Sequence, residues 1–362
     1  EGRTQPMTRH PEDGLIETVL ADYDLGTLQA VQDHGGTAAA NRRLQTTRGL
    51  WLLRTRGART STPEAVAFDH ALRRHLVRHG VPTAAPVARR DGETCTRLGG
   101  RVFEVYPLLP GRSCARADDD QLRSAARALA DFHRAAASFP LADDAPPVAQ
   151  YATVGVPDAL RRPEDPFLLG RAYDELLAGA AGALAEEAEC CRLWLERLRE
   201  EFGDGRYYRL PQVLTHGDYT LANLLFDGHG EVSGVFDFDW ARPAARVRDL
   251  ADGMYFIGAV RRTPLDPADI RSLTDASDFR VDRCVLWLSS YSGRAPLEAA
   301  EVHALPLAFA ARWLSVRIEG TAKVPPPERV HFSLRDLPRP LLWLARHWAE
   351  VAATLGCRPH TG

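Results

Sequence analysis

One stretch of the chain holds its most chemically suggestive residues. Residues 215–239 read THGDYTLANLLFDGHGEVSGVFDFD. In this stretch Asn223 follows Asp218 after four intervening residues, and strand-like runs on both sides of Asp227-Gly228 predict a hairpin. We place Asp237 on the returning strand of this hairpin. The hairpin would therefore bring Asp237 back beside Asn223.

This spacing suits the transfer of a phosphoryl group, which depends more on in-line positioning and charge neutralisation than on covalent chemistry. The amide oxygen of Asn223 and the carboxylate of Asp237 are hard oxygen ligands of the kind that Mg²⁺ prefers, with phosphate oxygens and water completing the shell. Asp218 would then accept a hydrogen bond from a substrate hydroxyl and act as general base. The three residues therefore have three distinct predicted roles.

The pattern H-G-D-x-x-x-x-N followed by D-F-D resembles the catalytic pattern of the aminoglycoside phosphotransferase and homoserine kinase-like family, also called the phosphotransferase enzyme family. Three flanking motifs are similar to motifs of the same family: Gly80-Val81-Pro82, LADFHR at residues 129–134, and RDLA at residues 248–251. Together the motifs span roughly residues 30–260. The resemblance implies a kinase that uses ATP and Mg²⁺ and phosphorylates an alcohol group.

The elements predicted around these motifs differ before and after Pro110-Gly111. Before Pro110-Gly111, the patterns predict a hairpin of strands 41–47 and 50–55, a helix over 62–79, and a strand pair of 86–89 with 102–109. After it they predict amphipathic helices over 118–139 and 174–202, short strands near the catalytic motif, and helices from Asp249 onward.

We therefore expect an α+β, protein-kinase-like fold with two lobes. Residues 1–108 would form a small antiparallel-sheet lobe that binds the nucleotide. Residues 109–362 would form a larger, mostly helical lobe that carries catalysis and substrate binding.

The resemblance also implies residues that bind the nucleotide. Kinases of this shape place a cation on the third strand and pair it with an acid on the helix of the first lobe. Arg54 occupies the matching strand position, and arginine can hold phosphate through two parallel hydrogen bonds. Glu64 and Asp69 both lie in the predicted helix, and either could be its partner.

Backbone groups complete this predicted nucleotide site. Gly35 and Gly36 would form a loop whose N–H groups face the phosphates. The strand from Phe103 would lie beside the adenine, and because Pro107 has no N–H, the donor there must be Leu108 or Leu109.

Two further residues of the motif have less specific roles. His216 is expected to orient the catalytic loop, and a direct part in proton transfer is the alternative. Asp239 could support the metal ligands, bind a second metal ion or contact the substrate.

Composition excludes several classes of function. A net charge of −3 gives no reason to expect nucleic acid as a partner. Lys323 is the single lysine among 45 basic residues, and it is followed by Val324 rather than by Ser or Thr, which excludes a P-loop lysine. The six cysteines have no metal-ligand spacing and favour a reducing compartment. Without an apolar run of 18 residues or a signal-like N-terminus, we expect a cytoplasmic protein that does not enter membranes, as a monomer or homodimer.

A small hydroxylated substrate is expected, because the sequence has no H-R-D, D-F-G or A-P-E pattern of the protein kinases. We favour an antibiotic, aminoglycoside-like or another amino-bearing natural product, phosphorylated in resistance or self-protection. The alternative is a metabolic kinase of homoserine, another amino alcohol or a sugar. Four acids of the second lobe could meet an ammonium group or be ordinary surface: Asp249, Asp252, Glu319 and Glu328.

Two other classes of function stay open. A metal-dependent hydrolase could use His216, Asp218 and Asp237, although stable zinc sites need more histidines at short spacing. A nucleotide-binding scaffold without turnover is the third hypothesis. The presence of Asp218, Asn223 and Asp237 together argues against it.

Overall fold

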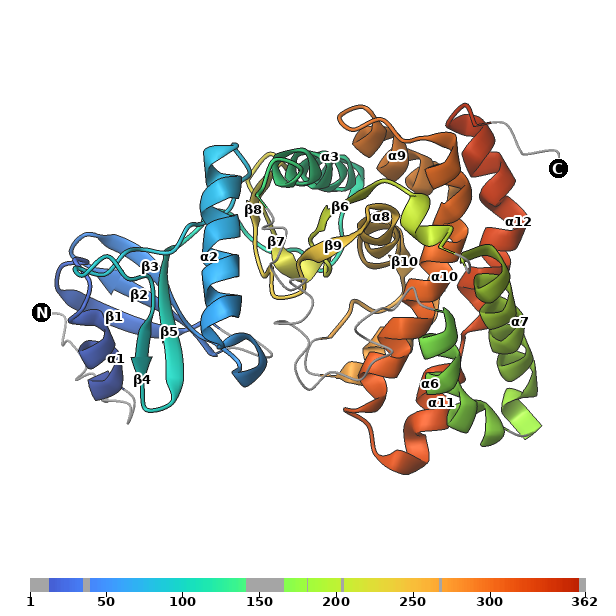
Figure 1. Ribbon diagram of the computed structural model, residues 1–362, viewed down its shortest axis with the longest axis horizontal. Coiled ribbons are helices and arrows are strands. Elements are labelled where there is room, and N and C mark those ends of the chain that lie inside the picture. Colours follow the sequence, from blue (N-terminus) through green and yellow to red (C-terminus); the bar gives the residue numbers. More distant parts are fainter. Residues whose placement is uncertain are drawn as a thin grey trace, which may run out of the picture. The chain divides into compact units, whose positions relative to one another are not determined.

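The structure is a computed structural model that describes residues 13–34, 40–140, 166–180, 182–202, 205–266 and 269–357. These residues form two compact units (Figure 1). The first contains the chain up to Arg74 together with Ala84–Leu109, and the second contains His75–Thr83 and the chain from Pro110. An antiparallel sheet dominates the first unit and helices dominate the larger second one, which confirms the expected fold class.

The first unit is built on a five-stranded antiparallel sheet in the order β1-β2-β3-β5-β4. Its elements are α1 (Asp13–Leu20), β1 (Leu28–Asp33), β2 (Ala40–Thr46), β3 (Gly49–Thr55), the 3₁₀ turn η1 (Ala58–Thr60), α2 (Pro63–Arg78), β4 (Thr96–Leu98) and β5 (Arg101–Pro107). The predicted hairpin before Thr55 is β2–β3. A small apolar core joins α1 to the sheet through buried residues such as Val19, Leu44 and Val105.

The predicted pairing of strand 86–89 with β5 is wrong. The partner of β5 is β4, and the two strands are joined by Gly99-Gly100 with φ of +57° and +73°, a left-handed pair that suits a tight hairpin turn. Residues 86–89 are not a strand, because β3 pairs with one edge of β5 and β4 with the other. The segment is attached to the sheet by a 2.8 Å hydrogen bond from Val87 N–H to Val105 O.

The second unit combines helices with three two-stranded sheets, β6–β9, β7–β8 and β10–β11. Its elements as far as the middle of the unit are α3 (Asp119–Ala136), α6 (Pro166–Ala178), η2 (Gly182–Leu184), α7 (Ala185–Phe202), η3 (Tyr207–Arg209), β6 (Gln212–Thr215), η4 (Leu221–Asn223), β7 (Leu224–Phe226), β8 (Val232–Val235), β9 (Arg242–Ala245) and α8 (Val247–Gly253). The remaining elements are η5 (Met254–Gly258), β10 (Val260–Arg261), η6 (Ile270–Thr274), β11 (Ser277–Asp278), α9 (Val281–Ser292), α10 (Ala299–Thr321), η7 (Pro326–Glu328), α11 (Arg329–Leu334) and α12 (Pro338–Thr354).

Helix α3 is the predicted helix over 118–139, and a capping box fixes its start. Asp118 accepts a hydrogen bond from the backbone N–H of Gln121, while the Gln121 side chain accepts one from the Asp118 backbone. The helix predicted over 174–202 is instead two helices, α6 and α7. Gly179 and Gly182 separate them, and Gly182 has φ of +63°, which a continuing helix cannot adopt.

Close packing in the second unit fixes the position of α8, whose residues are all buried. A Cβ atom at Gly253 would approach the Trp287 ring to 1.9 Å, so α8 and α9 can pack this closely because residue 253 is glycine. On its other side α8 lies against the long helix α10 (Figure 1). Among the described residues, no helix is long and apolar enough to cross a membrane.

Candidate active site

The predicted base, Asp218, lies in a short loop between β6 and η4. Gly217 gives this loop its shape, because its φ is +81° and a Cβ atom there would approach the carbonyl oxygen of Trp240 to 2.2 Å. The amide of Asn223 donates to the backbone oxygen of Asp218 at 2.8 Å and to its Oδ2 at 2.9 Å. The structure therefore brings Asp218 and Asn223 into direct contact.

The third residue of the pattern, Asp237, lies beyond the end of β8 and not on the returning strand as predicted. It has φ of +65°, a strained value for a residue with a side chain. The hairpin β7–β8 itself is as predicted, and the N–H of Phe236 donates to Asn223 O at 3.2 Å. The hairpin therefore places the residue before Asp237 against Asn223.

The charges around Asp218 are predominantly negative. Desolvation and then the charges of Asp237 and Asp252 raise the pKa of Asp218 to about 7. Burial is also the largest cause that raises the pKa of Asp252, to about 6. This excess of carboxylates suits a divalent cation, and because the Asn223 amide N–H group faces Asp218, its oxygen is left to a ligand.

A buried carboxylate, Asp249 of α8, holds the catalytic loop from behind. It accepts hydrogen bonds from the backbone N–H groups of His216 at 2.6 Å and Gly217 at 2.9 Å. His133 of α3 bonds the same carboxylate at 2.9 Å and the Tyr291 hydroxyl at 2.7 Å. Burial alone would raise the pKa of Asp249, but the hydrogen bond and charge of His133 outweigh it and lower the pKa to about 2.

The ring of His216 is buried and orients the loop. Its Nδ1 accepts from the backbone N–H of Asp218 at 3.3 Å, so Nε2 carries the proton and donates to Phe236 O at 3.1 Å. These contacts support the expected orienting role. Asp239 is half-buried two residues beyond Asp237, and its role stays a prediction.

Arg54, in the first unit, lies in a buried network of charges between β3, α2 and β5. Its Nη1 is 3.9 Å from Asp69 Oδ2, whereas Glu64 is exposed and forms no ion pair with it in the described part of the chain. Of the two acids considered, the structure thus places Asp69 and not Glu64 beside Arg54.

Asp69 also forms ion pairs with Arg56 and Arg73, and Arg56 in turn contacts Glu104. Burial alone would raise the pKa of Asp69, but the charges of Arg73, Arg56 and Arg54 hold it well below its usual value. The carboxylate is therefore ionised at neutral pH and shared by three guanidinium groups.

Of the predicted backbone donors, the N–H of Leu108 is already used, since it donates to Leu50 O at 3.1 Å. It is not available to an adenine ring, which leaves Leu109 as the predicted donor. Gly35 and Gly36 lie outside the described residues.

Arg312, which no sequence motif indicated, belongs to a charged group whose acids, Asp252 and Glu319, were considered above as partners of an ammonium group. Arg312 of α10 forms ion pairs with Asp252 and, at 3.1 Å, with Glu319, and its charge acts on Asp218. Of the four acids considered for an ammonium group, Asp249 is occupied by the catalytic loop. Glu328 is half-exposed and paired with Arg271.

A model of the phosphotransferase enzyme family matches residues 29–281. The chain belongs to this family. The phosphotransferase is 30% identical to a homoserine kinase from Neisseria meningitidis over 264 residues, which cover 68% of this chain and 78% of that protein. It is 29% identical to a homoserine kinase from Parvibaculum lavamentivorans over 319 residues, covering 87% and 88% of the two chains.

Solved structures show that the phosphotransferase has a kinase-like fold. A microcompartment-associated aminopropanol kinase has a TM-score of 0.65 at 17% identity, covering 95% of this chain and 99% of its own. An aminoglycoside phosphotransferase from Alicyclobacillus acidocaldarius has a TM-score of 0.63 at 16% identity, covering 98% and 97%. The amicoumacin kinase hAmiN, solved with AMP-PNP and Ca²⁺, has a TM-score of 0.61 at 15% identity, covering 97% and 96%. Together with the family match and the homoserine kinase relatives, this fold identifies the phosphotransferase as an enzyme of the kinase type.

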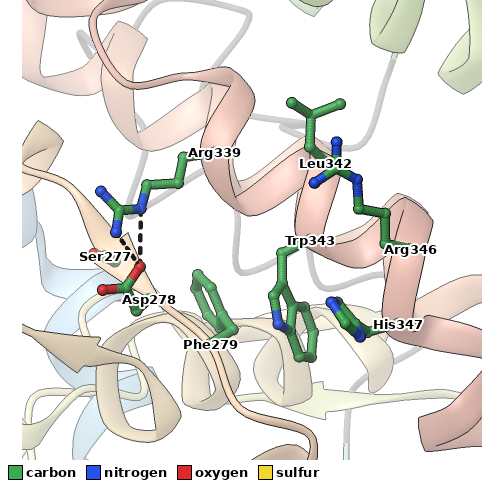
Figure 2. Close-up of a pocket in the computed structure, with 8 residues that line it drawn as sticks. All are labelled: Ser277, Asp278, Phe279, Arg339, Leu342, Trp343, Arg346 and His347. Carbon is green, nitrogen blue, oxygen red and sulfur yellow. Dashed lines mark hydrogen bonds and ion pairs between the residues drawn. The ribbon is translucent and has the colours of Figure 1, made fainter.

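A surface pocket of about 280 Å³ lies apart from these residues (Figure 2). Phe279, Trp343 and His347 line it, and Arg339 donates to Asp278 at 2.8 Å at its edge. The pocket contains none of the predicted site residues.

Proposed function

We propose that this phosphotransferase transfers the γ-phosphoryl group of ATP to the hydroxyl of a small molecule that also carries an amino group. The observation that supports this most is the contact of Asp218 with Asn223, beside a hairpin that leads into Asp237. In the proposed reaction Asp218 accepts the hydroxyl proton while the hydroxyl oxygen bonds to the γ-phosphorus and the bond to the β-bridging oxygen breaks.

The residues present fit a Mg²⁺ ion. The oxygen of Asn223 and the carboxylate of Asp237 would hold it, and when bound it would neutralise charge on the phosphates. Asp218, whose pKa of about 7 is close to the working pH, is suited to accept a proton. Arg54 would bind phosphate oxygens, with Asp69 fixing its guanidinium.

For the acceptor, we propose homoserine or a closely related hydroxylated amine before an antibiotic. This reverses the order favoured from the sequence, because relatives named homoserine kinase match over nearly the whole chain. The solved structures of antibiotic kinases, in contrast, show similarity of the fold alone. The abundance of carboxylates near Asp218 supports an amino-bearing acceptor in either case.

The acceptor class can be tested with a panel of small molecules. Purified enzyme with ATP and Mg²⁺ is incubated with homoserine, amino alcohols, sugars and aminoglycosides, and product masses are measured. We expect one added phosphoryl group on homoserine or a close analogue. Transfer to an aminoglycoside alone would restore the antibiotic assignment, and ATP binding without transfer to any acceptor would favour the scaffold.

A further inference from the structure

Helix α10 carries a charged stripe inside the core of the second unit. Most of its residues are buried, yet Arg312, Ser315 and Glu319 lie on one face at spacings of three and four residues. Arg312 Nη1 lies 3.1 Å from Glu319 and 3.4 Å from the Ser315 hydroxyl. Its Nε donates to Asp252 on the neighbouring helix α8 (Figure 1).

Stability does not explain this stripe. Buried ion pairs are often no more stable than apolar residues of the same size, because removing both charges from water is costly. The stripe is instead close to the predicted base. Its partner Asp252 lies one helical turn after Asp249 on α8, and Asp249 accepts from the N–H of Gly217, the residue before Asp218. The charges of Asp252, Arg312 and Glu319 accordingly all act on Asp218. A charged cluster kept in the core at this position is better explained by a ligand.

The cluster has two unused hydrogen-bonding groups of opposite charge. Oδ2 of Asp252 is buried and accepts no hydrogen bond from the described residues. The hydrogen bonds of Arg312 use Nε and Nη1, so Nη2 has no partner in the described part of the chain. An acceptor and a donor are therefore both open beside the ion pair.

We propose that Arg312, Asp252 and Glu319 form a subsite for a zwitterionic hydroxy amino acid, binding its carboxylate through Arg312 and its ammonium through Asp252 and Glu319. This inference rests on the proposed kinase function. A zwitterion brings both charges at once, so it adds no net charge to the buried cluster. An amine without a carboxylate would leave the open donor of Arg312 without the charge-assisted hydrogen bond that a carboxylate supplies.

Three acceptors with the same hydroxyl chain test the subsite in wild-type enzyme. Homoserine carries both charged groups, 3-aminopropan-1-ol lacks the carboxylate, and 4-hydroxybutanoate lacks the amine. We expect kcat/KM for homoserine to exceed that for each analogue by about 100-fold. Equal values for homoserine and 3-aminopropan-1-ol would overturn the inference without touching the kinase function.

Variants show which residues cause the expected preference for homoserine. Arg312→Met should raise the KM for homoserine about 100-fold but change kcat/KM for 3-aminopropan-1-ol less than 10-fold, which a general loss of structure could not produce. If that variant does not fold, Arg312→Lys, which keeps the charge but not the planar donors, should show the same selectivity in weaker form.

Glu319→Gln and Glu328→Gln form a matched pair on the acid side. We expect the first to raise the KM for homoserine and the second, at the half-exposed pair with Arg271, to leave it unchanged. Equal effects of the two would overturn the role of Glu319. Absence of transfer to every acceptor, including the wider panel, would instead count against the proposed function itself.

Discussion

At the scale of single residues, the site is governed by carboxylates held close together, and Arg312 compensates only part of their charge. Desolvation and the charge of Asp237 raise the pKa of Asp218 to about 7, so this carboxyl titrates close to neutral pH. When folding raises the pKa of a carboxyl, binding of the proton stabilises the folded state. This contribution is fully present below the pKa of the unfolded chain, and it is lost as the pH rises through the folded pKa of about 7. The catalytic arrangement is therefore costly to stability at alkaline pH.

Replacing Asp218 by Asn tests this cost. We expect kcat to fall by about 10²- to 10⁴-fold because the base is lost. In metal-free buffer at pH 8 the variant should unfold at a higher temperature than the wild type, by roughly 2–4 °C, while at pH 4 the two should be nearly equal. Calorimetry at both pH values measures this, and a less stable variant at pH 8 would contradict the assigned pKa.

At the scale of elements, local signals in the sequence predicted what local geometry decides. The hairpin β7–β8 and helix α3 follow from turn residues and helical periodicity, and two residues of the predicted site, Asp218 and Asn223, are in contact. The pairing of β5 with β4 is also local but was not predicted, although the Gly99-Gly100 turn between the two strands could have indicated it. His133 and Asp249 both belong to the flanking motifs. The sequence did not indicate that they are in contact, because 116 residues separate them.

The buried bond between α3 and α8 predicts a large effect of a conservative change. Asp249→Asn removes a charge that accepts from two backbone N–H groups and from His133, so it should lower the free energy of unfolding by about 3 kcal/mol. Asp131→Asn removes a surface ion pair with Arg134 on α3, the helix that carries His133. It should change the free energy of unfolding by less than about 1 kcal/mol. Denaturant unfolding compares the two, and equal losses would contradict the role of Asp249.

The network of β3 and α2 can be tested in the same way. We expect Asp69→Asn to raise the KM for ATP about tenfold or more and to destabilise the protein by about 3–5 kcal/mol, because it leaves Arg54, Arg56 and Arg73 undercompensated. Glu64→Gln is the control, since Glu64 is exposed and should be neutral. If Glu64→Gln raised the KM for ATP and Asp69→Asn did not, Glu64 and not Asp69 would be the acid that supports Arg54.

At the scale of the whole molecule, each compact unit contains one part of the predicted machinery. The buried cations of the first unit suit phosphate, and the carboxylates of the second suit a metal ion and an amine. The family motifs predicted nucleotide-binding residues in the first unit and catalytic residues in the second. They did not indicate Arg312, because a single arginine in an apolar helix gives no recognisable pattern. Its partner Asp252 comes from another helix, and only folding brings the two together.

The central claim is that this phosphotransferase moves a phosphoryl group to a hydroxyl at Asp218. The most direct measurement is the mass and ³¹P resonance of the product formed from homoserine, ATP and Mg²⁺ by the wild type and by Asp218→Asn, with Glu328→Gln as control. We predict one phosphoester on the hydroxyl, formed equally by the control and reduced at least about 100-fold in Asp218→Asn. Undiminished transfer by Asp218→Asn would contradict the account.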